Sequence, residues 1–86
     1  TNMYNYFTFI HINNGDIMDI DIRKFIIGNF KEDTIEDIKN SIDTSISSKE
    51  EDPLLGLGVL FELAWNNSDE ETKYTILNNI KKGMTN

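Results

Sequence analysis

The sequence predicts an all-α protein, a compact unit of four short helices. Apolar residues recur at spacings of three and four along three stretches, and a fourth stretch is apolar on nearly every side. Residues that commonly begin helices stand just before these stretches. With 86 residues, the chain is too short for two independent cores. No apolar run approaches the roughly 20 residues that cross a bilayer, so we expect one domain and no membrane partner.

The charge balance and the rare residue types exclude several kinds of chemistry. There are 15 acidic residues against eight Lys and Arg, a net charge of -7, whereas nucleic-acid binding needs clustered basic residues. No cysteine is present, which excludes disulfides, thiolate catalysis and thiolate metal sites. A single histidine excludes a multi-histidine metal site. We expect no nucleic-acid partner and no cofactor.

Residues 1–17 differ in composition from the rest of the chain. They hold four of the nine aromatic residues, and their first charged residue is Asp16. Their alternating apolar pattern would suit a lone strand, which has no partner strand in the remaining sequence. Disorder is the second interpretation, and translated upstream sequence or an added extension is the favoured one, with Met18 as the natural start. We therefore divide the chain into an N-terminal extension, 1–17, and a small acidic helical domain, 18–86.

The first two helices are expected over 19–30 and 34–46. The apolar stripe of the first is Ile22, Phe25, Ile26 and Phe30, and that of the second is Ile35, Ile38, Ile42 and Ile46. Acids in the first turn of the first helix favour its N-terminus electrostatically. Thr34 and Asp37 form a candidate capping box before the second helix, and a second candidate pair lies one residue earlier.

The third helix is expected from about Pro53 to Asn66. Its apolar residues are Leu54, Leu55, Leu57, Val59, Leu60, Phe61, Leu63, Ala64 and Trp65. A helix that is apolar all round is buried, so we expect this one to be the central element. Gly56 and Gly58 predict either a close backbone approach or a non-helical lead-in. Glu62, the one acid in the stretch, is expected at the solvent edge.

The fourth helix is expected over 69–82. Its apolar stripe is Ile76, Leu77 and Ile80, with Met84 at the flank. Ser68 and Glu71 form a candidate capping box, and Gly83 is a candidate C-cap. In so small a domain, the free energy gained from apolar burial hardly exceeds the entropy cost of folding. Self-association buries more apolar surface and can add stability, so homodimerisation stays open.

None of the patterns that resemble a reactive or ligand site is specific. His11 is the only imidazole and lies in the extension, and the acids within 16–21 do not follow an EF-hand register. Gly56-Leu57-Gly58 lacks the preceding strand and the third glycine of a dinucleotide loop. The acids at 50–52 suit a solvated helix start, and Trp65 suits a core anchor. We expect a protein without enzymatic activity.

The third helix carries the most distinctive string of the chain. The motif is Gly56, Leu57, Gly58, Val59, Leu60, Phe61 and Glu62, followed by Trp65 and Asn66. Together with an opening Met18-Asp19-Ile20-Asp21-Ile22-Arg23, it resembles the small acid-soluble spore protein I family of endospore-forming bacteria. The resemblance covers 18–86. One departure is Leu55, which stands where the family has proline directly before the first glycine, whereas here Pro53 comes two residues earlier.

The resemblance implies synthesis in the developing forespore, residence in the spore core and no enzymatic activity. The abundance of Ile, Asn and Lys fits a low-GC genome. The first functional hypothesis is a non-enzymatic spore-core component, whose partner would be an unknown spore-core protein. The second is a helical interaction module or regulator that uses the apolar helix 54–65. DNA binding through a helical pair ranks below both.

Overall fold

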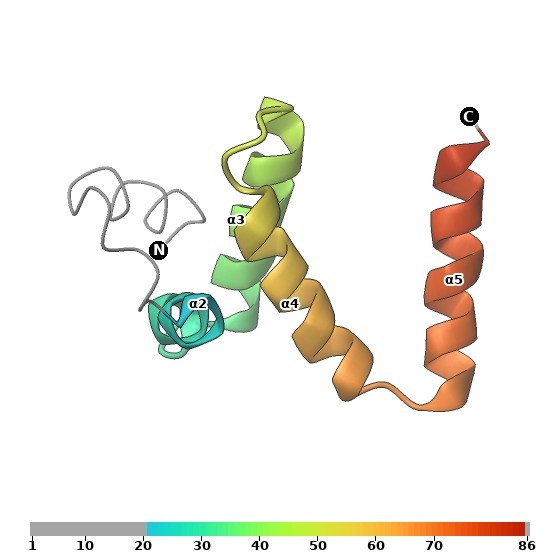
Figure 1. Cartoon of the computed structure of the whole chain (residues 1–86), viewed down its shortest axis with the longest axis horizontal. Helices are drawn as coiled ribbons and strands as arrows, with labels where there is room; N and C mark the ends of the chain where they lie inside the picture. The colour runs from blue at the N-terminus through green and yellow to red at the C-terminus, as the bar shows by residue number, and fades with distance from the viewer. Residues whose placement is uncertain (1–20, 86) are drawn as a thin grey trace.

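The computed structural model describes residues 21–85, and these residues form four α-helices and no strand. The helices are α2 (Ile22–Phe30), α3 (Ile35–Ser48), α4 (Leu54–Asn66) and α5 (Glu70–Met84) (Figure 1). The predicted all-α fold with four short helices is confirmed, and each predicted boundary lies within three residues of the observed one. The predictions for 1–17 lie outside the described residues.

Three of the four helices pack around one small core. Ile26 and Phe30 of α2 and Val59 of α4 are its buried members. The partly buried residues packed against them are Ile22, Phe25, Ile38, Ile42, Leu57 and Leu60. In contrast, α5 stands apart from α2, α3 and α4 (Figure 1) and buries none of its residues. The compact packing is therefore a property of α2–α4, which we call the α2–α4 body.

The start of α3 is fixed by a reciprocal capping box, as the sequence predicts. The backbone N–H of Asp37 donates to Thr34 Oγ1 at 3.1 Å, and the backbone N–H of Thr34 donates to Asp37 Oδ2 at 3.2 Å. Both side chains thereby satisfy amides that have no partner within the helix. At the other end, Lys49 adopts the left-handed conformation with φ 57° and terminates the helix.

Replacing Thr34 by alanine tests this cap. We expect Thr34→Ala to lower the free energy of unfolding by about 1 kcal/mol, because the amide of Asp37 loses its acceptor. Chemical denaturation followed by circular dichroism measures the change. Thr34→Ser keeps the hydroxyl and should remain close to the parent chain, and equal losses in the two variants would contradict the assignment.

Two predicted caps of the last helix are wrong. The cap of α5 is Asp69, whose carboxylate accepts the backbone N–H of Thr72 at 2.8 Å. Ser68 instead closes the preceding helix, since its hydroxyl donates to the carbonyl of Ala64 at 2.6 Å. Gly83 lies inside α5, which continues to Met84 with Thr85 as C-cap. The spacing of residues allowed either Ser68 or Asp69 to cap α5. The hydrogen bond from Ser68 to Ala64 shows that Ser68 belongs to the end of α4.

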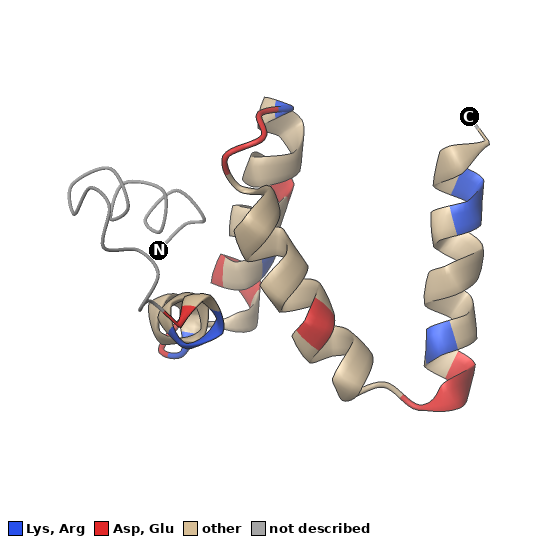
Figure 2. Cartoon of the chain, viewed as in Figure 1, with Lys and Arg blue, Asp and Glu red and all other residues tan. Residues whose placement is uncertain are grey.

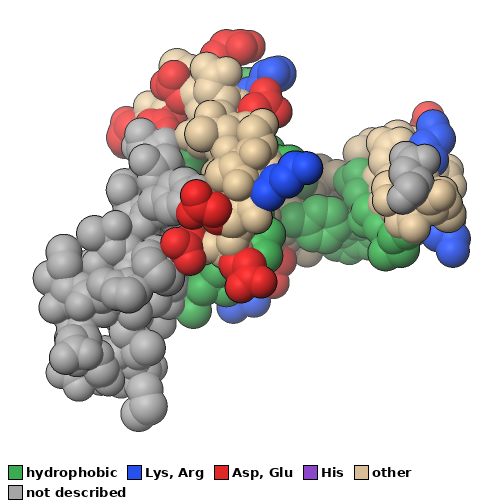
Figure 3. Space-filling model, turned by 90° about the horizontal axis from the view of Figure 1, so that it is seen from above, with side chains coloured by type: hydrophobic (Ala, Val, Ile, Leu, Met, Phe, Trp, Pro, Cys, Tyr) green, Lys and Arg blue, Asp and Glu red, His purple; other side chains and the backbone are tan. Residues whose placement is uncertain are grey.

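The predicted all-round burial of α4 is also wrong. Only Gly56 and Val59 are buried in this helix. Leu54 and Phe61 are 58% and 44% exposed, and Leu55 and Leu63 are exposed as well. The reason is geometric, because α2 and α3 cover one side of α4 and α5 stands too far away to bury the other. Figure 3 shows hydrophobic side chains at the surface between the α2–α4 body and α5.

The glycines of α4 were predicted to mark either a non-helical lead-in or a close backbone approach, and the first of these predictions is wrong. Both lie within the helix, so a non-helical lead-in is absent from this described segment. At Gly58, an added Cβ would meet no atom within 4 Å, so no neighbouring backbone approaches closely there. Gly58 therefore lowers the stability of α4, and no close packing contact within the described chain requires a glycine there.

Gly58→Ala is expected to stabilise the protein. Alanine in place of an interior helical glycine contributes about 0.5–1 kcal/mol because it restricts the unfolded backbone. The added methyl group has open space. Thermal unfolding should shift upward relative to the parent chain. An unchanged or lower midpoint would show that Gly58 makes a contact that the described chain does not contain.

Candidate functional site

The family motif that the sequence singles out lies entirely on α4 and divides between two sides of it. Gly56 and Val59 face the core, where Leu57 and Leu60 pack partly buried beside them. The remaining predicted residues point away from the core: Gly58, Phe61, Glu62 and Trp65 are half-buried or exposed. The motif thus supplies both the core contact of α4 and its outward surface.

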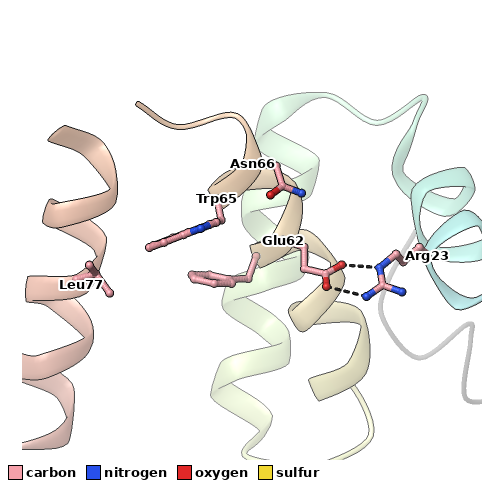
Figure 4. Close-up of a pocket in the computed structure, with 6 residues that line it drawn as sticks. Arg23, Glu62, Trp65, Asn66 and Leu77 are labelled. Atoms are coloured by element: carbon pink, nitrogen blue, oxygen red, sulfur yellow. Dashed lines mark hydrogen bonds and ion pairs between the residues drawn. The ribbon is translucent and has the colours of Figure 1, made fainter. Parts of the chain in front are cut away.

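Glu62 joins α4 to α2 through a two-pronged ion pair. Arg23 Nε donates to Glu62 Oε1 at 2.6 Å, and Arg23 Nη2 donates to Glu62 Oε2 at 2.7 Å (Figure 4). Glu62 is half-buried, so the expected position at the solvent edge is only part of its role. The sequence pattern did not predict this pair. A signal was available, because Arg23 is the only arginine of the chain and Glu62 the only acid of α4.

The ion pair changes the protonation behaviour of both side chains. The hydrogen bond from Arg23 lowers the pKa of Glu62 below its ordinary value, and the same bond raises the pKa of Arg23. The Arg23 side chain is mostly exposed and the Glu62 side chain is about half exposed, so water weakens their attraction. The two parallel bonds nevertheless connect α2 to α4 at one defined point beside the core.

An aromatic groove lies beside this ion pair. The rings of Phe61 and Trp65 are 5.8 Å apart between centroids and tilted by 30°. Lys73 Nζ lies 5.4 Å from the Trp65 ring centroid, a cation–π contact that links α5 to α4. Leu77 of α5 lies across the groove from Trp65 (Figure 4). Trp65 is thus part of a groove wall, and the expected role as a core anchor is wrong.

The groove has a volume of about 530 Å³. Its lining residues are Arg23, Phe61, Glu62, Trp65, Asn66 and Leu77. A smaller hollow of about 260 Å³ lies between α2 and α4, on the side of Gly58 and Leu54. The Arg23–Glu62 pair borders both hollows. Such a surface offers apolar contact area with one fixed ion pair at its rim, which suits the binding of another apolar surface.

The described part of the chain has neither a cluster of metal-ligating side chains nor a membrane-spanning helix. Within residues 21–85, no group of three His, Cys, Asp or Glu side chains is placed to hold a metal ion. No described helix is both long enough and apolar enough to cross a membrane. Acids lie in the first turns of α3 and α5, where they favour the helix N-termini, and two lysines lie in the last turn of α5 (Figure 2).

Comparison with known proteins gives the chain a family. The sequence model of small, acid-soluble spore protein I matches residues 20–84. Small, acid-soluble spore protein I of Bacillus cytotoxicus is 35% identical over 69 residues, which are 80% of this chain and 99% of that protein. The proteins of the same name from Bacillus cereus and Bacillus anthracis are each 36% identical over 67 residues, 78% of this chain and 97% of theirs. No solved structure is significantly similar to the chain. The chain therefore belongs to the small, acid-soluble spore protein I family.

Proposed function

We propose that this protein is a non-enzymatic component of the spore core that is made during sporulation. The observation that carries the proposal is the family match over 20–84, which includes every described helix. Relatives from three Bacillus species bear the name of a spore protein and align over nearly their whole length.

The charge of the chain supports its recovery as an acid-soluble protein. At about pH 2 its carboxylates are protonated, and eight Lys and Arg remain charged. A net positive chain of this size repels its copies and stays dissolved. Acid solubility follows here from composition and requires no contact with DNA.

Fractionation of spores tests the location. Dormant spores of the producing organism are separated into coat, membrane and core fractions, and the protein is detected with an antibody. We expect it in the core fraction, and we expect its synthesis to begin in the forespore. Detection only in vegetative cytoplasm would overturn the proposal.

A second candidate function is a protein-interaction module on α4. Its support is that Phe61 is 44% exposed and that Trp65 lines an open groove. If so, wild-type protein immobilised on a resin should retain a defined protein from spore-core extract. Phe61→Asp should abolish that retention, whereas Leu63→Asp on another part of α4 should preserve it. Equal retention by both variants would count against a role for the groove.

A further inference from the structure

The last helix carries an apolar stripe that the rest of the described chain covers only in part. Its exposed members are Tyr74, Leu77, Ile80 and Met84. The contact of this stripe with α4 is partial: Lys73 lies over the Trp65 ring, but Leu77, which lines the groove, is still 43% exposed. Tyr74 and Met84 are more open still, at 65% and 73% exposed. This exposed apolar stripe is the kind of surface that a partner helix covers.

The charges of α5 indicate which helix that is. Its first turn carries Glu70 and Glu71, and its last turn carries Lys81 and Lys82 (Figure 2). Each acid precedes its lysine by eleven positions, which is close to three full turns of about 3.6 residues. The acidic and basic ends therefore lie on the same flank of the helix, one at each end.

We propose that α5 pairs antiparallel with α5 of a second copy of this chain. Leu77 is the middle residue of the helix, so a two-fold axis beside it overlays the whole length of both helices. Glu70 and Glu71 of one copy then lie beside Lys81 and Lys82 of the other, twice per dimer. A parallel pair would instead place acids beside acids and lysines beside lysines, which is unfavourable.

The remaining features of α5 agree with this arrangement. The antiparallel order also opposes the two helix dipoles favourably. Lys73, the other charged residue near the first turn, is held toward α4 by Trp65 and lies 3.7 Å from Glu70. It therefore does not oppose the lysines of the second copy. The partner helix covers Leu77 and with it the mouth of the aromatic groove.

Sedimentation equilibrium of the full chain is the first test. We expect a dimer whose dissociation constant rises at least about 30-fold in Leu77→Asp, the loss typical of a central interface residue. Asn79→Asp adds the same charge on the opposite side of α5 and should leave the constant nearly unchanged. A wild-type chain that stays monomeric up to millimolar concentration would overturn the proposal, as would equal effects of the two variants.

Charge reversal separates dimerisation from folding. The double variant Lys81→Glu, Lys82→Glu and the double variant Glu70→Lys, Glu71→Lys should each be monomeric alone. Mixed in equal amounts they should form a heterodimer, because each acidic end then meets a basic end. Persistent dimers of either variant alone, or a mixture without heterodimers, would contradict the pairing.

The chain has no cysteine, so single cysteines report the direction of the pair. An oxidised mixture of Glu70→Cys and Met84→Cys chains should yield the mixed disulfide in excess over the two homodimeric products. Predominant linkage between two copies of the same variant would show a parallel arrangement and overturn the proposal.

Discussion

Ile26→Ala is expected to remove most of the stability of the α2–α4 body. Ile26 is fully buried, with an exposed fraction of 0%, and is one of only three buried apolar side chains in the described core. Truncating a buried isoleucine to alanine costs about 2–5 kcal/mol, since contacts are lost and a cavity is left. Whole domains are stable by only about 5–15 kcal/mol, and a core this small belongs at the low end.

Urea denaturation followed by circular dichroism measures this loss. The matched control is Ile27→Ala, the same substitution one position along the chain. Ile27 is 39% exposed, so the change should stay close to the few tenths of a kcal/mol typical of surface sites. Similar losses in the two variants would show that Ile26 is not the centre of the core.

The helices were predictable from sequence because their signals are local. A stripe of isoleucines at spacings of three and four needs no knowledge of the rest of the chain, and neither does the Thr34–Asp37 box. A cap pattern becomes ambiguous where the same side chain can also form a hydrogen bond with the preceding helix. Ser68 matched a cap pattern as well as Asp69 did, and its bond to Ala64 was invisible in the sequence.

The sequence predicted which segment carries the candidate site, but not which of its side chains are exposed. The motif on α4 was identified residue by residue, but periodicity only shows which residues share a side of a helix. Which side is covered depends on how many neighbours pack against it. Here α5 stands apart, so Phe61 and Trp65 became groove walls where burial was expected. The Arg23–Glu62 pair spans two helices and required the tertiary arrangement.

Acidification is expected to destabilise the protein while it stays in solution. Hydrogen bonds lower the pKa of Glu62 and the pKa of Asp69 in the folded chain. A carboxylate with a lowered pKa stabilises the fold fully above its ordinary value, which is 4.5 for Glu62 and 3.8 for Asp69. That stabilisation is lost as the pH falls below these values and through the folded pKa. The growing positive charge adds repulsion between the lysines.

The urea midpoint should therefore be steady near pH 7 and fall progressively below about pH 4.5. Glu62→Gln preserves the size of the side chain but cannot ionise, so this variant should be less stable at pH 7 and show a flatter profile. Glu32→Gln makes the same change at an exposed residue between α2 and α3 and should follow the parent curve. A midpoint independent of pH, or equal flattening by both variants, would contradict the role given to the Arg23–Glu62 pair. Positive charge keeps the protein dissolved at low pH and also weakens its fold. We therefore expect the protein to remain soluble in acid while it loses stability.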